Sequence, residues 1–303
     1  MTQLSQEAAA FMAGFPRSDE RTDFTRIADI RAETRAGFSP ASMRAIERHQ
    51  LVRDDIEVAG VPCERVASSV AGTASGRCLF VFGGAFIVGD PFSDLPIIGA
   101  IAEWCRVEVI APKYRLAPEH PSPAAADDCF TVYAELADEP GQLIVGGESA
   151  GGNLALVTVQ RAMLDGVRVP TAVAALSPAA DLRPDRDLFG WSFDADPSLH
   201  PDRMLDVLDA YVGAVEPTDP GVSPAFGGFE GFPPTIITTG SRDLFMPMCL
   251  RLTRKMIRAG VDVTTRVWDG LWHVFEYYDQ FPESAESLRE IAAFLTDELN
   301  AAR

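Results

Sequence analysis

The chain has 303 residues and a formal net charge of −18 at pH 7, with 47% hydrophobic and 23% charged residues. These proportions are ordinary for a globular protein with one catalytic unit. The negative charge argues against nucleic acid or an anionic membrane as a partner, because both would repel the chain at moderate salt. The first seven residues are polar and no apolar run is long enough to span a membrane. We therefore expect a cytoplasmic protein without a signal peptide.

The cysteines predict neither a disulfide framework nor a metal site. They are odd in number, scattered along the chain and placed mostly inside apolar runs, which favours buried thiols. No spacing among them is that of a metal site, and we predict no metal and no cofactor. The five are Cys63, Cys78, Cys105, Cys129 and Cys249.

In chain order, the sequence predicts a helical leading segment over residues 1–50 and a catalytic domain over 51–303, with an insertion at about 183–232. The domain alternates short apolar or β-branched runs with helical patterns, which is typical of an α/β fold. The expected strands are Ile56–Val58, Glu64–Val66, Cys78–Phe82, Val107–Ala111, Leu143–Gly146, Ala172–Leu176, Thr235–Thr239 and Val263–Val267.

The segment Gly147–Gly151 (GESAG) lies between the apolar run 143–145 and the helix-like stretch 153–157. A glycine-flanked serine at a strand-to-helix turn is typical of the nucleophile elbow of α/β-hydrolases. The turn strains the backbone of Ser149, and only very small neighbours leave room for strand and helix to pack closely. An isolated match is more often an ordinary turn in a chain with 24 glycines, so the interpretation depends on residues elsewhere.

The elbow requires an acid and then a histidine downstream, because this fold supplies its triad in that order. Asp243 lies in the loop that follows the predicted strand 235–239, and His273 lies in the loop that follows 263–267. We predict Asp243 as the acid and His273 as the base. Asp262 and Asp269 are the rivals for the acid.

The other three histidines are expected to be structural. A lone histidine is more often a surface or satisfied core residue than a catalytic one. His49 lies in a polar helix-like segment, and His120 and His200 each precede a proline in a turn. Only His273 follows a strand after both Ser149 and Asp243, as the triad requires.

An oxyanion hole needs backbone N–H groups that point at the carbonyl oxygen as it becomes negative. Gly83 and Gly84 follow the predicted strand 78–82, at the loop where this fold places such donors. We predict Gly83, Gly84 and Ala150 as the oxyanion donors. A glycine turn that only lets a helix cross the sheet is the simpler interpretation, and the serine elbow downstream argues against it.

Together these residues resemble the hormone-sensitive-lipase-like family of bacterial esterases within the α/β-hydrolases, over about residues 70–300. The resemblance implies a mostly parallel eight-stranded sheet flanked by helices. It also implies a helical cap, made by the leading segment and the insertion, which sets specificity over the site. Homodimers are common among similar esterases, and we expect one here. The matching segments are 82–85, 113–121, 147–152, 177–178, 240–243 and His273.

Three positions depart from the family pattern. Phe82 replaces the histidine that usually begins the oxyanion loop, so support of that loop must come from packing. Ala85 replaces the third glycine, which is harmless only if its backbone avoids a positive φ. Glu148 replaces the usual aspartate before the serine.

A substrate site for esters needs apolar side chains near the nucleophile. The chain has such residues in the leading segment, after the oxyanion loop, in the insertion and beside the base, although any one of them is more often simply core. We predict Phe86, Trp191, Phe193, Trp272 and Val274 as substrate-binding residues, with Phe11, Phe15 and Phe92 as further candidates.

The sequence therefore predicts a serine carboxylic-ester hydrolase that acts on small or medium apolar esters through an acyl-enzyme. A lactone hydrolase with the same triad is an alternative, because segments 240–245 and 270–275 resemble monoterpene lactone hydrolases of this family. An alternative of another class is a ligand-binding receptor built on an inactive hydrolase, as in plant gibberellin receptors, which resemble the family but lack the catalytic histidine. Phe82 is the feature that favours the receptor.

Overall fold

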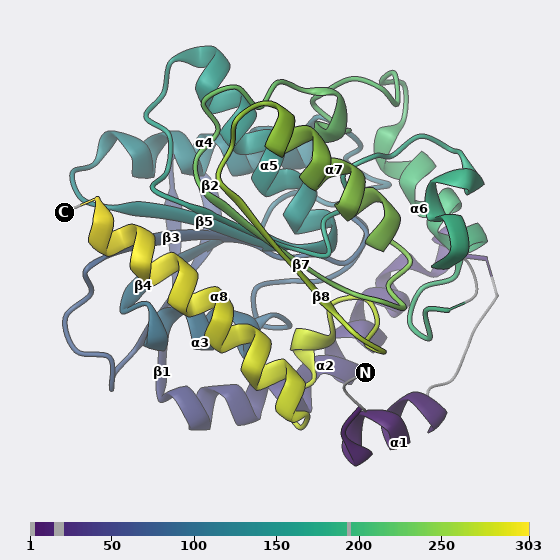
Figure 1. Cartoon of the computed structure of the whole chain (residues 1–303), viewed down its shortest axis with the longest axis horizontal. Coiled ribbons are helices and arrows are strands. Elements are labelled where there is room, and N and C mark those ends of the chain that lie inside the picture. Colours follow the sequence, from purple (N-terminus) through teal and green to yellow (C-terminus); the bar gives the residue numbers. More distant parts are fainter. Residues whose placement is uncertain (1–3, 15–20, 193–194, 303) are drawn as a thin grey trace.

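The computed structural model describes residues 4–14, 21–192 and 195–302, and within them one sheet runs in the order β1-β2-β4-β3-β5-β6-β7-β8 (Figure 1). β2 is antiparallel to β1 and β4, and the other neighbouring pairs are parallel. All eight predicted strands are confirmed, and the first two are longer than expected. They are β1 Leu51–Val58, β2 Val61–Ser68, β3 Gly76–Val81, β4 Val107–Pro112, β5 Leu143–Glu148, β6 Val173–Leu176, β7 Thr235–Gly240 and β8 Val263–Trp268.

Helices cover both faces of this sheet (Figure 1), as the resemblance implied. α4, α5 and α7 pack on one face, and α3 and α8 pack together on the other. The α-helices are α1 Gln6–Gly14, α2 Ile27–His49, α3 Leu95–Trp104, α4 Ala124–Asp138, α5 Ser149–Asp165, α6 Pro201–Val212, α7 Met246–Arg258 and α8 Pro282–Ala301. Short 3₁₀ helices are η1 Phe24–Arg26, η2 Arg186–Ser192, η3 Pro224–Phe226 and η4 Phe275–Tyr277.

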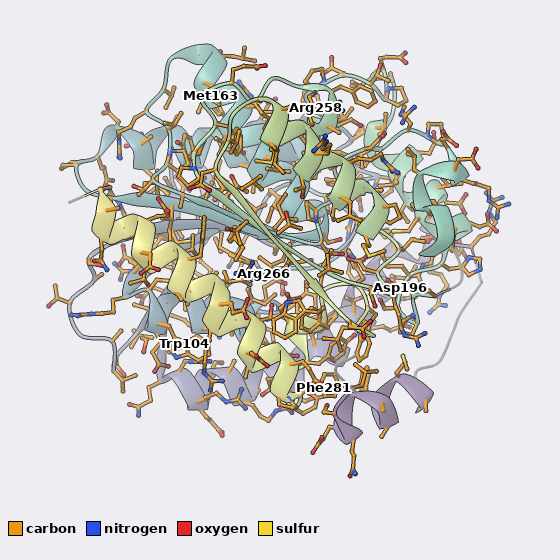
Figure 2. The ribbon with its side chains drawn as sticks, viewed as in Figure 1. Trp104, Met163, Asp196, Arg258, Arg266 and Phe281 are labelled. Carbon is orange, nitrogen blue, oxygen red and sulfur yellow. The ribbon has the colours of Figure 1, made fainter. Side chains whose placement is uncertain are left out.

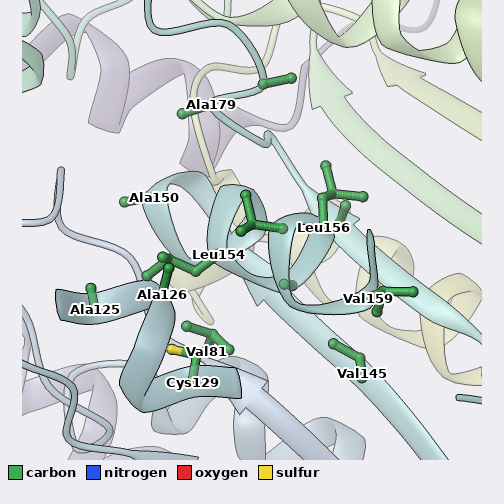
Figure 3. Packing of buried hydrophobic residues seen from close by; sticks show 14 of the residues in the cluster. Val81, Ala125, Ala126, Cys129, Val145, Ala150, Leu154, Leu156, Val159 and Ala179 are labelled. Carbon is green, nitrogen blue, oxygen red and sulfur yellow. The ribbon is translucent and has the colours of Figure 1, made fainter. Parts of the chain in front are cut away.

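The core is divided by the sheet into two main clusters. Cys129 of α4 and Leu154 of α5 pack against Val81 and Val145 of the central strands on one side (Figure 3). On the other side, side chains of α3 and α8 pack against the opposite face of the same strands. Both faces of the sheet are buried because helices cover it on each side. The sequences of the central strands are therefore continuous apolar runs. All five cysteines are buried and free, as predicted.

The leading helices and the insertion both contact the loop that follows β3. Arg31 of α2 donates through Nε to the carbonyl oxygen of Ile87 at 2.8 Å. Tyr211 of α6 stacks on Phe86 with ring centroids 3.6 Å apart. Segments that are distant in the sequence therefore meet beside the glycines at the carboxyl end of β3.

Candidate active site

Ser149 stands at the sharp turn between β5 and α5, where β5 ends at Glu148 and the helix begins with the serine itself. Its φ is +54°, the left-handed region that non-glycine residues rarely adopt. A Cβ on Gly147 would collide with the carbonyl of Gly151, and one on Gly151 would collide with that of Val81. The glycines are therefore required by the close approach of strand and helix, as the elbow interpretation expected.

The three residues predicted as the triad form one hydrogen-bonded chain. His273 Nε2 lies 2.8 Å from Ser149 Oγ, and His273 Nδ1 lies 2.9 Å from Asp243 Oδ1. Asp243 is fully buried, whereas Ser149 and His273 each keep 8% of their surface exposed. The hydrogen bonds therefore connect a fully buried carboxylate to a serine that is still slightly exposed to solvent.

Local hydrogen bonds hold the Asp243 carboxylate in place. Its Oδ2 accepts from Thr239 Oγ1 at 2.8 Å, and its Oδ1 accepts from the backbone N–H of Phe245 at 2.8 Å. The two rival acids, Asp262 and Asp269, are exposed. The structure thus brings Asp243 alone of the three aspartates to His273.

The charges around His273 favour its protonated form. Burial disfavours the imidazolium, but the charge and hydrogen bond of Asp243, with the charges of Asp196 and Glu148, outweigh it and raise the pKa of His273 above 6.5. Burial also acts to raise the pKa of Asp243, but the charge and hydrogen bond of His273 prevail and lower that pKa. Asp243 is therefore ionised where the imidazole can accept a proton.

The other three histidines take no part in the hydrogen bonds between Ser149, His273 and Asp243. His49 is buried, and its Nδ1 lies 2.6 Å from Glu103 Oε2. His120 is exposed, and His200 is partly buried at the residue before α6. Their positions agree with the structural roles expected for them.

The predicted oxyanion donors are not equivalent. A Cβ on Gly83 would collide with the Glu148 carboxylate, so glycine is required there, and its place in the oxyanion hole stays a prediction. Gly84 has a φ of +100°, and a Cβ there would collide with the carbonyl of Val88, so glycine is required. Ala150 lies in the first turn of α5, where N–H groups have no partner within the helix. Gly83, Gly84 and Ala150 all remain candidate donors.

Packing supports the loop where the family histidine is absent. The Phe82 ring stacks on Tyr114 with centroids 4.1 Å apart, and the Tyr114 hydroxyl donates to the Phe82 carbonyl at 2.9 Å. Ala85 does not avoid a positive φ, since its φ is +53°. The third position of the loop therefore carries the backbone strain that a glycine would not.

An acidic cluster lies beneath the elbow, formed by Asp94, Glu148 and Tyr277. The Tyr277 hydroxyl donates to the Glu148 carboxylate and lies 3.1 Å from Asp94 Oδ1. The Tyr277 hydroxyl thus lies between two buried carboxyl groups. Burial and the charge of Glu148 raise the pKa of Asp94 well above its usual value, and burial raises that of Glu148 to about 7.

The residues predicted to bind substrate occupy different places. Trp272 is fully buried in a cluster with Phe11, and Val274 is fully buried between the sheet and α8, so neither lines an accessible site. Their full burial corrects the prediction for both. Phe86 is buried against Tyr211.

Other predicted pocket residues bear less on the site. Phe92 packs beneath the guanidinium groups of Arg35 and Arg53. Trp191 belongs to η2, where its side chain is not described, and Phe15 and Phe193 lie outside the described residues.

Some residues beside the site carry no sequence signal of their role. Phe245 packs edge-on against the His273 ring with centroids 4.8 Å apart, and Phe189 of η2 stacks on Phe245 at 6.4 Å. Asp196, in the insertion, accepts the backbone N–H of His273 at 3.2 Å. Phe189 and Asp196 lie in no recognisable motif, whereas Phe245 ends the segment 240–245 and follows Asp243 closely enough to be suspected.

Among the described residues, no helix is long and apolar enough to cross a membrane, and no group of metal-binding side chains is found.

Comparison with known proteins extends this description. The family model for the alpha/beta hydrolase fold matches residues 78–277. The chain is 30% identical over 285 residues to an esterase of Acinetobacter venetianus, covering 89% of this chain and 93% of that protein. It is 33% identical over 242 residues to the carboxylesterase/phospholipase LipF of Mycobacterium tuberculosis, covering 75% and 64% of the two chains.

A solved structure supports the same assignment. A hormone-sensitive lipase from a metagenome library superposes with a TM-score of 0.84 at 28% identity, covering 97% of this chain and 96% of that one. The family match spans more than half of the chain, and the relatives are esterases over most of its length. The chain therefore belongs to the α/β-hydrolase family as a hormone-sensitive-lipase-like member, and it is a carboxylic ester hydrolase.

Proposed function

We propose that Ser149 is the nucleophile of this esterase, that His273 is its general base and that Asp243 orients and stabilises the imidazolium. The observation that carries the proposal is the continuous chain from Ser149 Oγ to His273 Nε2 at 2.8 Å and from His273 Nδ1 to Asp243 at 2.9 Å. These distances suit proton transfer from a hydroxyl to a base and orientation of that base by a carboxylate.

In the proposed reaction, Ser149 Oγ attacks the ester carbonyl while His273 Nε2 takes its proton. The N–H groups of Gly83, Gly84 and Ala150 bind the oxygen as it becomes negative, and the N-terminus of α5 favours that charge. The proton on His273 passes to the departing alkoxide, which leaves an acyl group on Ser149. Water deprotonated by His273 then cleaves the acyl-enzyme and restores the serine.

We propose small or medium apolar esters as the substrates. Phe245 lies against the His273 ring and Phe189 stacks on Phe245, so the surroundings of the base are aromatic and uncharged on that side. A net charge of −18 also disfavours strongly anionic esters. A lactone is opened by the same groups, so lactone hydrolysis stays an alternative within this proposal.

We also propose that residues 1–50 and the insertion at 183–232 form the cap over the site. Arg21 of the leading segment forms an ion pair with Asp206 of α6, and Arg31 of α2 contacts the backbone beside the oxyanion loop. The stacking of Tyr211 on Phe86 fixes α6 to the same loop. These contacts support the proposal that both segments limit the size of the acyl or alcohol group.

The test is hydrolysis of nitrophenyl esters from acetate to dodecanoate, and of one medium-ring lactone, by wild type and variants. Ser149→Ala and His273→Ala should each remove about a thousandfold or more of the turnover. His120→Ala, an exposed histidine, is the matched control and should hydrolyse like wild type. Full activity of Ser149→Ala would refute the serine mechanism, and turnover of esters without lactones would set the lactone alternative aside. Stoichiometric ligand binding without turnover would favour the receptor.

A further inference from the structure

Asp196 is a buried carboxylate in the insertion, far in sequence from the three residues of the proposed triad. Only 2% of its surface is exposed. Figure 2 shows it beside the end of the sheet where β8 finishes, on the side where α6 lies. Its Oδ1 accepts from the N–H and hydroxyl of Ser198 at 2.8 and 2.7 Å and from the N–H of Leu199 at 3.1 Å. These bonds fix the carboxylate to its own loop.

The other carboxylate oxygen of Asp196 reaches the two loops that carry the acid and the base. Its Oδ2 accepts the backbone N–H of Leu244, the residue after Asp243, at 2.9 Å. The same oxygen accepts the backbone N–H of His273 at 3.2 Å. One oxygen of the insertion therefore joins the loop after β7 to the loop after β8.

We propose that Asp196 is a positioning residue of the esterase, through which the insertion holds Asp243 and His273 in register and adds negative charge behind the imidazolium. The proposal rests on the triad function given above, and it adds a residue that touches neither the substrate nor the reacting atoms. An insertion that supplied only a cover for the substrate would not need to bury a carboxylate against the catalytic loops, since burying a charge is costly.

The geometry explains why a carboxylate is present there. Each oxygen of Asp196 accepts backbone N–H groups, so both ends of the side chain must be acceptors. An asparagine has one acceptor oxygen and one NH₂ donor, which would face an N–H group at one end or the other. Asparagine would therefore lose the contacts either to its own loop or to the two catalytic loops.

The charge has a second consequence. The ionisable groups that face His273 are Asp243, Asp196 and Glu148, and all three raise its pKa against the effect of burial. Those that face Asp196 are Asp243, whose like charge adds to burial in raising the pKa of Asp196, and His273, which lowers it. Loss of the Asp196 charge should therefore lower the pKa of His273, whereas a merely structural contact would leave that pKa unchanged.

The experiment compares wild type, Asp196→Asn and Asp181→Asn. Asp181 is a similarly buried aspartate just before the insertion that pairs with Arg183 rather than with the catalytic loops, so it is the matched control. We expect Asp196→Asn to lower kcat about tenfold through misalignment. The acid limb of its kcat/KM profile should move to lower pH by about 0.5 to 1 unit, because one negative charge near the base is lost. Asp181→Asn should keep the wild-type profile.

A second measurement does not depend on turnover. NMR titration of the histidine rings gives the pKa of His273 directly in each protein, so it remains informative even if Ser149→Ala shows that the proposed mechanism is wrong. A lower pKa of His273 in Asp196→Asn and in Asp196→Ala supports the proposal. An unchanged pKa in a variant that keeps the wild-type circular dichroism spectrum overturns it.

If neither variant folds, a measurement on the wild-type protein still tests the proposal. The carboxyl carbon of Asp196, followed by NMR, should show the ionised form at the pH where His273 titrates. A carboxyl group that is still protonated at that pH would overturn the proposal, because it could not supply the charge.

Discussion

At the scale of single residues, the site depends on a serine held in a left-handed backbone conformation, which residues other than glycine rarely adopt. A left-handed φ costs a non-glycine residue about 1–2 kcal/mol. Ser149 adopts it because β5 and α5 leave no other path for the chain, and Gly147 and Gly151 allow that path. The strained turn positions Ser149 Oγ at the first residue of α5, within hydrogen-bond distance of His273. The backbone strain lowers stability but serves the function of the site.

Asp243 should be far more important for activity than the nearest alternative carboxylate. Asp243→Asn removes the charge that holds and stabilises the imidazolium, and we expect kcat to fall about a thousandfold or more. Asp269→Asn is the matched control, because Asp269 is exposed and near His273 in sequence, and its kcat should stay within about twofold of wild type. The reverse order in initial-rate measurements would refute the assignment of the acid.

The pH dependence of activity should follow His273. Its pKa is raised above 6.5, because the charges of Asp243, Asp196 and Glu148 outweigh the effect of burial. Below that pKa the ring is protonated and cannot accept the Ser149 proton, so kcat/KM should fall as pH drops, with a midpoint above 6.5. Initial rates in constant-ionic-strength buffers test this, and an acid limb that is flat down to pH 5 would contradict it.

At the scale of secondary-structure elements, the oxyanion loop after β3 is held from several directions. The Phe82 ring stacks on Tyr114, Arg31 of α2 binds the loop backbone at Ile87, and Tyr211 of α6 stacks on Phe86. Gly83 packs closely against the Glu148 carboxylate of the acidic cluster, where a Cβ would collide. Packing and peripheral hydrogen bonds thus hold a loop that a histidine usually supports in this family.

The hydroxyl of Tyr114 should matter more for catalysis than for stability. Tyr114→Phe removes the hydrogen bond to the Phe82 carbonyl, and we expect a loss of about 1 kcal/mol of stability and about tenfold in kcat as the loop shifts. Tyr133→Phe is the control, because its buried hydroxyl also donates to a backbone carbonyl, that of Arg168, away from the site. It should lose similar stability in urea titrations and no activity. Equal kcat in both variants would show that the loop does not depend on Tyr114.

At the scale of the whole molecule, the sheet ends in two edge strands, β1 and β8, within the described residues. Edge strands leave backbone N–H and C=O groups without partners in the sheet and are places where another chain can pair. The homodimer and the cytoplasmic location expected from the sequence stay predictions.

Light scattering measures the assembly directly. We expect twice the mass of one chain, with no change when the salt concentration rises, if backbone pairing and apolar contacts hold the dimer together. The mass of a single chain at micromolar concentrations would contradict the expected homodimer.

The sequence by itself determined the strand order along the chain, the elbow at Ser149 and the candidates Asp243 and His273. Apolar periodicity, glycine spacing and triad order are local properties of the sequence, and they also predicted the buried cysteines. The contact between Phe82 and Tyr114 was expected only as unspecified packing, because a sequence does not show which rings meet.

The tertiary structure decided what depends on distance between remote segments. It brought Gly83 against the Glu148 carboxylate, it buried Trp272 and Val274 in the core, and it joined Asp196 to the two catalytic loops. None of these follows from residue type or spacing, because each depends on which side chains face one another once the sheet has formed. Burial then sets the charges of the carboxyl groups and of His273, since desolvation and neighbouring charge act only in the folded state.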